Sequence, residues 1–193
     1  LGIGVILIFV ASPKYAQFAL MGIAGACFMG IFLALESYRL ERLAIWRNPE
    51  KYEKGYQTLQ GLYAIGSGGV FGVGIGNSVQ KLGFVPEAQN DMIFSIICEE
   101  LGLAGAGIIV FLFLLLIWRF FLIASGSRDL FGALIATGAM AHMMIQVILN
   151  IAVVTNTIPN TGITLPFISY GGTSVMFLLI EMGLVLSVSQ VVD

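Results

Sequence analysis

Long, almost uncharged apolar runs alternate with polar stretches along this chain. A helix needs roughly 20 mainly apolar residues to cross the hydrocarbon core of a bilayer. The runs at 15–35, 101–118, 130–155 and 173–191 are close to this length or above it, and each predicts a membrane-spanning helix. A shorter run at 1–12 is expected to be the end of a further span, cut by the boundary of the sequence. The pattern predicts an all-α protein, a polytopic transmembrane helix bundle forming a single membrane domain over residues 1–193.

Two polar stretches, 36–100 and 156–172, are expected to be loops. Residues 36–54 mix basic and acidic side chains with apolar anchors such as Trp46. This mixture is typical of an amphipathic segment at the membrane interface, and a solvated linker is the alternative. Residues 55–83 contain nine glycines, too many for a continuous helix because each costs about 1 kcal/mol. The long loop should therefore be part-helical and fold back against the membrane, where protein or water covers its backbone.

A helix is predicted to begin at the Asn90-Asp91 pair, near the end of this loop. The carboxylate of Asp91 can accept hydrogen bonds from the unpaired N–H groups of a first helical turn, so Asp91 is predicted to be the N-cap. Glu99 and Glu100 would then lie near the end of the helix, where the macrodipole disfavours negative charge. They are either functional or solvated acids at a frayed helix end.

Composition narrows the class of protein. Hydrophobic residues make up 58% of the 193 residues and charged residues only 10%, which indicates a membrane protein. The basic residues form no continuous patch, so nucleic-acid binding is not expected. Cys27 and Cys98 have neither the spacing of a metal site nor that of a disulfide framework. The chain begins at Leu1 inside an apolar stretch, and we expect it to be a fragment that lacks an N-terminal part.

Basic residues in the short loops predict the orientation. The positive-inside rule applies to short loops, whereas long loops cross the membrane largely regardless of their charge. Lys14 and Arg128 lie in short connections and therefore mark the cytoplasmic side. The loops at 36–100 and 156–172 are then expected to be extracytoplasmic.

Several stretches between Gly55 and Ser174 resemble the SEDS family, the polytopic peptidoglycan glycosyltransferases FtsW, RodA and SpoVE, in both order and spacing. The Asn77-Ser78 and Gln80-Lys81 pattern resembles the division and sporulation branch, FtsW and SpoVE. Two positions depart from the family pattern: Gln89 stands where members often have His, and Ser37-Tyr38-Arg39 stands where Pro-Tyr-Arg is usual. The stretches are GYQTLQGLYAIGSGGVFGVGIGNSVQKLGFVPEAQNDMIF, EELG and NTGITLPFISYGGTS.

The resemblance implies a multi-pass protein of the bacterial plasma membrane that polymerises lipid II into glycan strands during division or sporulation, releasing undecaprenyl diphosphate. It also implies a class B penicillin-binding protein as partner. Asp91 falls on the aspartate regarded as essential for polymerisation. Lys81 and Arg39 are expected to bind the diphosphate of the substrate, and Glu87 either caps the helix or binds the acceptor sugar.

Three roles stay open for the Asp91 carboxylate. It could act as the general base for the acceptor hydroxyl, orient that hydroxyl, or hold a divalent cation, Mg²⁺ or Mn²⁺, against the diphosphate. A position at a helix N-terminus would favour the charged form and make the carboxylate a weaker base. No cofactor other than such a cation is expected.

Two ionisable residues, His142 and Glu181, lie within the predicted spans. His142 shares a helix face with Gln146 and Asn150, which predicts an interhelical hydrogen-bond stripe, with a proton relay as the alternative. Glu181 is expected to be a hydrogen-bonded or protonated buried carboxyl. A lipid II flippase or another transporter is the rival function, in which this polar stripe would carry substrate. A non-catalytic scaffold that binds division partners is the third possibility.

Overall fold

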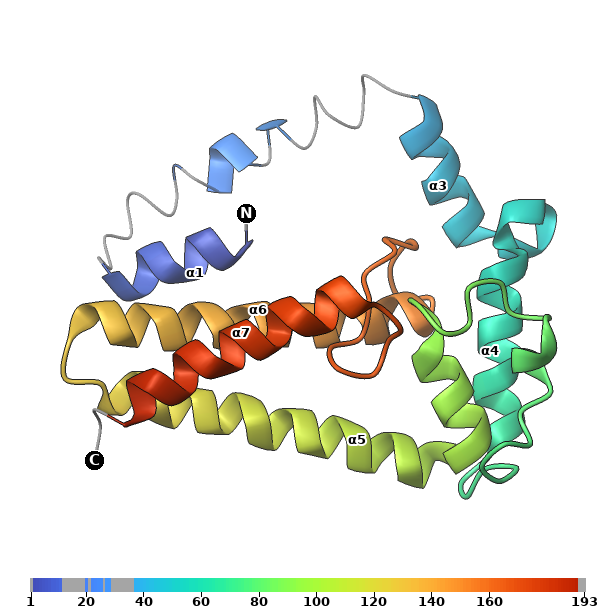
Figure 1. The fold of residues 1–193 in the computed structure, drawn as a ribbon. Coiled ribbons are helices and arrows are strands. Elements are labelled where there is room, and N and C mark those ends of the chain that lie inside the picture. The colour runs from blue at the N-terminus through green and yellow to red at the C-terminus, as the bar shows by residue number, and fades with distance from the viewer. Residues whose placement is uncertain (1, 12–19, 21, 26, 29–36, 191–193) are drawn as a thin grey trace.

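The computed structural model describes residues 2–11, 20, 22–25, 27–28 and 37–190, and every regular element among them is helical (Figure 1). Three described helices are long and apolar enough to cross a membrane: α5 (Ile93–Gly126), α6 (Leu130–Val154) and α7 (Gly172–Ser189). They pack together, and the short helix α1 (Gly2–Ala11) lies against α6. The predicted all-α fold class is confirmed. Most of the predicted span at 15–35 lies outside the described residues.

The chain reverses between α5 and α6 in a short connection. α6 begins after Asp129, whose Oδ2 accepts a hydrogen bond from the backbone N–H of Gly132 at 2.9 Å. This side-chain cap pairs one of the N–H groups that a helix start leaves without an intrahelical partner. The core between the helices is apolar: Ala136, Met143 and Val185 are almost fully buried, and Phe113 and Phe120 of α5 are buried as well.

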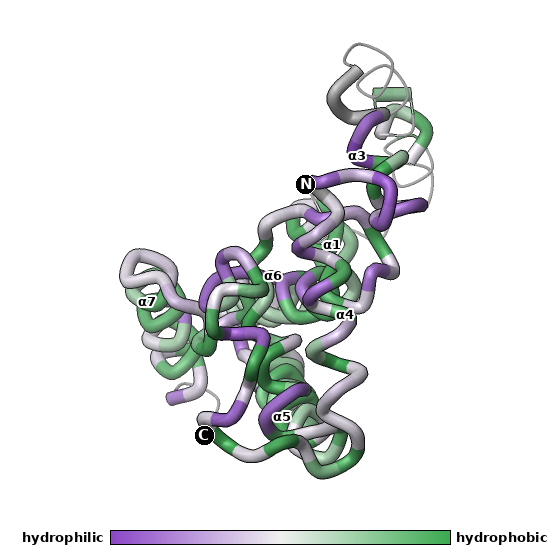
Figure 2. The backbone as a smooth tube through the Cα atoms, turned by 90° about the vertical axis from the view of Figure 1, so that its right-hand side faces the viewer, coloured by the Kyte–Doolittle hydropathy of each residue, from purple (hydrophilic) through white to green (hydrophobic). Residues whose placement is uncertain are grey.

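A part-helical region lies at the opposite end of the bundle (Figure 1). It contains α3 (Ser37–Arg47) and α4 (Tyr56–Gly68), and α4 packs against the N-terminal part of α5. Viewed from this end, hydrophilic residues gather on α3 and on the loops, whereas α5 and α7 are mainly hydrophobic (Figure 2). Three short 3-10 helices complete the region: Pro49–Lys51, Glu53–Gly55 and Gln80–Leu82.

Helix α5 is bent at Gly102, whose φ of 67° and ψ of −172° are not helical. The bend leaves backbone groups of α5 without helical partners, and the glycine-rich segment after α4 supplies new ones. Leu103 N–H donates to Gly69 O at 3.0 Å, and Val73 N–H donates to Glu99 O at 2.9 Å. Two further bonds of 3.0 Å, from Ala104 N–H to Val70 O and from Gly74 N–H to Glu100 O, complete the contact. The bend turns the first part of α5 toward α4 (Figure 1).

The start of α5 corrects one prediction. The helix begins at Ile93, its N-cap is Met92, and no side chain caps it. Asp91 therefore is not the N-cap. The residues before Met92 form consecutive turns, in which Asn90 N–H donates to Glu87 O at 2.9 Å. Glu99 and Glu100 do lie near the end of a helical segment, just before the bend at Gly102, but this end is not frayed, because Val73 N–H and Gly74 N–H bond to their backbone oxygens.

Candidate functional site

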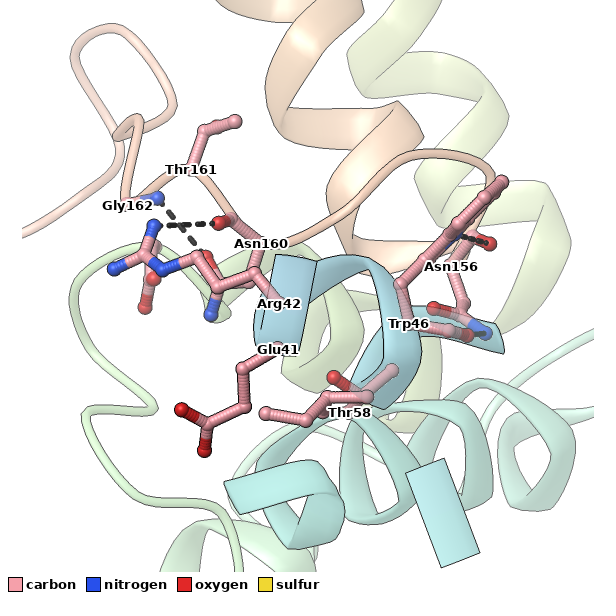
Figure 3. A pocket seen from close by; sticks show the side chains of 10 residues that line it. Glu41, Arg42, Trp46, Thr58, Asn156, Asn160, Thr161 and Gly162 are labelled. Carbon is pink, nitrogen blue, oxygen red and sulfur yellow. Dashed lines mark hydrogen bonds between the residues drawn. The ribbon is translucent and has the colours of Figure 1, made fainter. Parts of the chain in front are cut away.

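A cavity of about 290 Å³ opens where α3 and α4 meet the loop between α6 and α7 (Figure 3). Its walls come from four segments that are far apart in the sequence. Asp91 lines it from the turns before α5, and Thr58 lines it from α4. The remaining lining residues are Glu41, Arg42, Ile45 and Trp46 of α3, and Asn156, Asn160, Thr161 and Gly162 of the loop.

Helix α3 forms one wall because its side chains bond to the loop. Trp46 Nε1–H donates to the backbone oxygen of Asn156 at 2.9 Å. One turn earlier, Arg42 Nη1 donates to the backbone oxygen of Asn160 at 3.2 Å (Figure 3). Trp46 and Arg42 lie four positions apart and so share one helix face. The Arg42 guanidinium group and the Asp91 carboxylate therefore belong to the same cavity.

Two amide side chains contact the carboxylate of Asp91, and a third fixes its backbone. Gln57 Nε2 of α4 donates to Oδ1 of Asp91 at 3.3 Å, and the side chain of Asn160 also hydrogen-bonds to this carboxylate. The fully buried Asn150 of α6 donates through Nδ2 to the backbone oxygens of Asp91 and Ile163, each at 2.8 Å. Asn150 thereby joins the Asp91 turn to the loop between α6 and α7.

Burial raises the pKa of Asp91 above its ordinary value of 3.8. The negative charge of Glu87 raises this pKa further, while the hydrogen bonds from Asn160, Gln57 and the Asp91 backbone oppose the shift. Loss of hydration wins because it disfavours the charged carboxylate more than these bonds favour it. The expectation that a helix N-terminus would make Asp91 a weaker base is therefore wrong.

The same turn is tied to the loop at two more points. Ser169 Oγ donates to Asn90 O at 2.6 Å and accepts from Leu165 N–H at 2.7 Å. Tyr170 N–H donates to Gln89 O at 2.8 Å. These bonds bring together two of the sequence stretches that resemble the SEDS family, although about 80 residues of chain separate them. The position of Asp91 therefore depends on the loop between α6 and α7.

A second cavity, of about 560 Å³, lies beside this turn and is lined by Lys81, Glu87 and Gln89 together with apolar side chains. Lys81 Nζ is 2.6 Å from Oε1 of Glu100, forming a partly exposed ion pair. Lys81 and Glu87 therefore lie in a cavity other than the one that Asp91 lines.

Glu99 holds the segment that carries Lys81. Its carboxylate is almost fully buried, accepts a hydrogen bond from Val79 N–H at 3.1 Å and pairs with the hydroxyl of Ser78. Ser78 Oγ in turn accepts from Lys81 N–H at 3.1 Å. The unusual pair of glutamates thus fixes a loop: Glu99 bonds to its start, and Glu100 bonds to the Lys81 side chain.

The structure places the predicted site residues as follows. Asp91 lines the first cavity, and its role stays a prediction. The side chain of Arg39 lies outside the described part of the structure. Arg42, one turn further along α3, lines the cavity and was not among the predicted site residues. Gln57 and Asn160 were also missed, and their only sequence signal is that they fall within the stretches that resemble the SEDS family.

The polar stripe of α6 contacts different partners along its length. Nδ1 of His142 lies 2.8 and 2.9 Å from the two carboxylate oxygens of Glu181 in α7. This confirms the predicted interhelical bond for His142 and the predicted hydrogen bond for Glu181, but Glu181 is only partly buried. Both residues line a mainly apolar groove between α1, α6 and α7. Asn150, at the other end of the stripe, bonds to backbone oxygens of the loops.

Comparison with known proteins identifies the relatives of this chain. The model of the family of cell cycle proteins FtsW, RodA and SpoVE matches residues 1–193. Stage V sporulation protein E of Bacillus subtilis is 45% identical over 192 residues, which is 98% of this chain and 52% of that protein. A probable peptidoglycan glycosyltransferase FtsW of Coxiella burnetii is 42% identical over 188 residues, covering 95% of this chain and 50% of the relative. The chain thus spans about half the length of these curated relatives.

Two solved structures have a similar fold. One is a peptidoglycan synthase complex described as coordinating polymerization and crosslinking; its matching chain has a TM-score of 0.79 and 27% identity, covering 98% of this chain and 53% of that one. The other is a mutant of the rod shape determining protein RodA from Thermus thermophilus, with a TM-score of 0.53 and 34% identity, covering 67% of this chain and 39% of that one.

Proposed function

The chain belongs to the FtsW, RodA and SpoVE family of cell cycle proteins, and from this premise we propose that the full-length protein is a peptidoglycan glycosyltransferase. It is a multi-pass bacterial membrane protein. Its proposed reaction is the polymerisation of lipid II into glycan strands with release of undecaprenyl diphosphate. Relatives named probable peptidoglycan glycosyltransferase support the reaction class. The observation that carries the proposal is the Asp91 carboxyl, which has a raised pKa and lines a cavity at one end of a membrane bundle.

In the proposed mechanism Asp91 is the general base. Its carboxylate accepts the proton of the acceptor hydroxyl, and the hydroxyl oxygen forms the new bond to the anomeric carbon of the donor sugar. The bond from that carbon to the diphosphate breaks, and its electron pair leaves on the diphosphate. A raised pKa suits this role, because a carboxylate with a pKa nearer to the working pH accepts a proton more readily. Gln57 and Asn160 keep the carboxylate oriented toward the cavity.

Cationic side chains are proposed to bind the leaving diphosphate. Arg42 lines the cavity with Asp91, and a guanidinium can pair with two phosphate oxygens at once. Arg39 lies three positions earlier on α3 and is proposed to act beside it. Lys81 and Glu87 are proposed to bind a further part of the substrate in the neighbouring cavity.

A divalent cation is compatible with the residues present. Asp91 and Glu41 both line the cavity, and Mg²⁺ is commonly held by one or two carboxylates together with substrate phosphates. Mg²⁺ or Mn²⁺ bound there would neutralise charge on the diphosphate. The proposed roles of Asp91 as base and of Arg42 as phosphate ligand do not depend on it.

The assembly partner is also a proposal. A solved structure with the same fold belongs to a peptidoglycan synthase complex that coordinates polymerization and crosslinking. We propose by analogy that a class B penicillin-binding protein, which would perform the crosslinking, assembles with the full-length protein.

The test is lipid II polymerisation by the full-length protein carrying Asp91→Asn. Asparagine can still accept the hydrogen bond from Gln57, but it cannot take up a proton, so the rate should fall by roughly 100-fold or more. Asp129→Asn is the matched control, because Asp129 caps α6 at the opposite end of the bundle; it should polymerise like the wild type. Polymerisation by Asp91→Asn at the wild-type rate would refute the catalytic role. Loss of activity with chelator and recovery with Mg²⁺ or Mn²⁺ would show that the reaction needs a cation.

Transport is the second candidate function, and the pair of His142 and Glu181 is the observation that favours it. Ionisable residues within a membrane commonly mark a pathway for protons or substrates. If the protein is a flippase, disrupting this pair should stop lipid II translocation, whereas Asp91→Asn should leave translocation intact. Translocation assays in proteoliposomes with both variants separate the two functions.

A further inference from the structure

The loop that follows α4 exposes large apolar side chains. Residues 69–76, here named the apolar loop, contain Phe71 with 85% of its surface exposed and Ile75 with 81%. Val70 and Val73 of the same loop are also exposed. No charged residue occurs between Gly55 and Gln80. Contiguous exposed apolar surface of this kind marks a contact with a protein or with a membrane.

The backbone of the apolar loop is suited to a medium without water. The N–H groups of Gly72, Val73 and Gly74 donate to Gly68 O, Glu99 O and Glu100 O at 2.8, 2.9 and 3.0 Å. The oxygens of Gly69 and Val70 accept from Leu103 N–H and Ala104 N–H, each at 3.0 Å. Irregular backbone is tolerated within a bilayer only where protein groups satisfy its hydrogen bonds. The bend of α5 supplies most of these groups, and α4 supplies Gly68 O.

The apolar loop is continuous with the exposed apolar surface of α5. Its hydrogen bonds fix it against Leu103 and Ala104, at the start of the apolar length of α5. Leu103, Ile108 and Leu112 each expose more than half of their surface along this helix. In Figure 1 the loop lies beside the bend of α5, below the lower end of α4. The exposed apolar surface of α5 therefore extends onto the loop.

We propose that the apolar loop is immersed in the bilayer and anchors the part-helical region at a fixed depth. The adjoining lipid leaflet surrounds it, because the loop is uncharged, part of its backbone is paired with protein groups, and its surface continues the exposed apolar side of α5. The same chain runs on to Ser78 and Lys81, which are held by Glu99 and Glu100. The anchor thereby sets the height of the Lys81 cavity above the membrane. This proposal does not depend on the proposed enzymatic activity.

Spin labels on the full-length protein in lipid nanodiscs test the proposal. In a cysteine-free background, Phe71→Cys and Ile75→Cys are labelled separately, and collision rates with oxygen and with a water-soluble nickel complex are measured. Oxygen concentrates in lipid and the nickel complex in water. We expect high oxygen and low nickel accessibility at both positions, as at the reference Leu112→Cys within α5. Glu53→Cys is the reference for an exposed site outside the bundle.

Two other outcomes would each overturn the proposal. High nickel accessibility would place the loop in water, and low accessibility to both reagents would show that other protein covers it. Phe71→Trp, in a background whose other tryptophans are replaced by phenylalanine, provides a second measurement with little change in side-chain size. Its fluorescence should be quenched by brominated lipids, most strongly by those brominated near the headgroup end of the acyl chain. Absence of quenching would contradict immersion.

Discussion

Replacing Gly102 with alanine should destabilise the protein, because both the conformation and the surroundings of this residue require glycine. The φ of 67° and ψ of −172° at Gly102 fall in a region that only glycine adopts readily, and forcing another residue into it costs about 1–3 kcal/mol. A Cβ at this position would lie 2.4 Å from both Gly72 N and Val70 O. These are backbone atoms within the paired segment and cannot rotate away, so overpacking adds about 1–3 kcal/mol. The expected loss for Gly102→Ala is therefore about 2–6 kcal/mol.

Gly107→Ala is the matched control on the same helix. A Cβ at Gly107 would meet nothing within 4 Å, and alanine favours a regular helix by about 1 kcal/mol over glycine. Thermal unfolding of the purified full-length variants in one detergent, followed by circular dichroism, should show Gly102→Ala melting well below the wild type and Gly107→Ala melting at or above it. The reasoning fails if Gly102→Ala lies within about 0.5 kcal/mol of the wild type, or if both variants lose the same stability.

Three further predictions concern orientation, the intramembrane pair and pH. Glu53→Cys in a cysteine-free version should react with an impermeant thiol reagent in intact cells and Ser127→Cys should not; the reverse pattern would invert the predicted topology. Glu181→Gln should lower thermal stability, because it weakens the bond to His142, yet retain lipid II polymerisation, whereas loss of polymerisation in a folded variant would contradict the assignment of catalysis to Asp91. Because folding raises the pKa of Asp91, this carboxyl stabilises the folded state when it is protonated. That stabilisation is fully present below pH 3.8 and is lost as the pH rises through the higher folded-state pKa. Asp91→Asn should therefore be at least as stable as the wild type at neutral pH, as measured by unfolding over a pH series, and a less stable variant would contradict burial as the cause of the shift.

The sequence pattern by itself predicted the spanning helices and the part-helical loop. Uncharged apolar runs indicated α5, α6 and α7, because a bilayer demands long apolar helices whatever their neighbours are. The glycine content of residues 55–83 indicated a part-helical loop, and the structure has α4 followed by an irregular segment there. The motifs that resemble the SEDS family predicted Asp91 as a site residue, and that role stays a prediction.

The tertiary structure decided which side chains meet. Arg42 reaches the cavity because α3 docks on the loop between α6 and α7 through Trp46. Its partner Asn160 is 118 positions away, a separation at which no periodicity carries information. The bend at Gly102 likewise depends on backbone groups of Gly69 and Val70 that pair with it.

The pKa of Asp91 is the clearest case of this division. The sequence places a carboxylate just before a helix, and a helix N-terminus favours its charged form. Folding moves the helix start to Ile93 and partly buries the carboxyl near Gln57 and Asn160, so loss of hydration outweighs the hydrogen bonds. Which effect wins depends on how much protein surrounds the group, and that is a property of the packed structure and not of the order of residues.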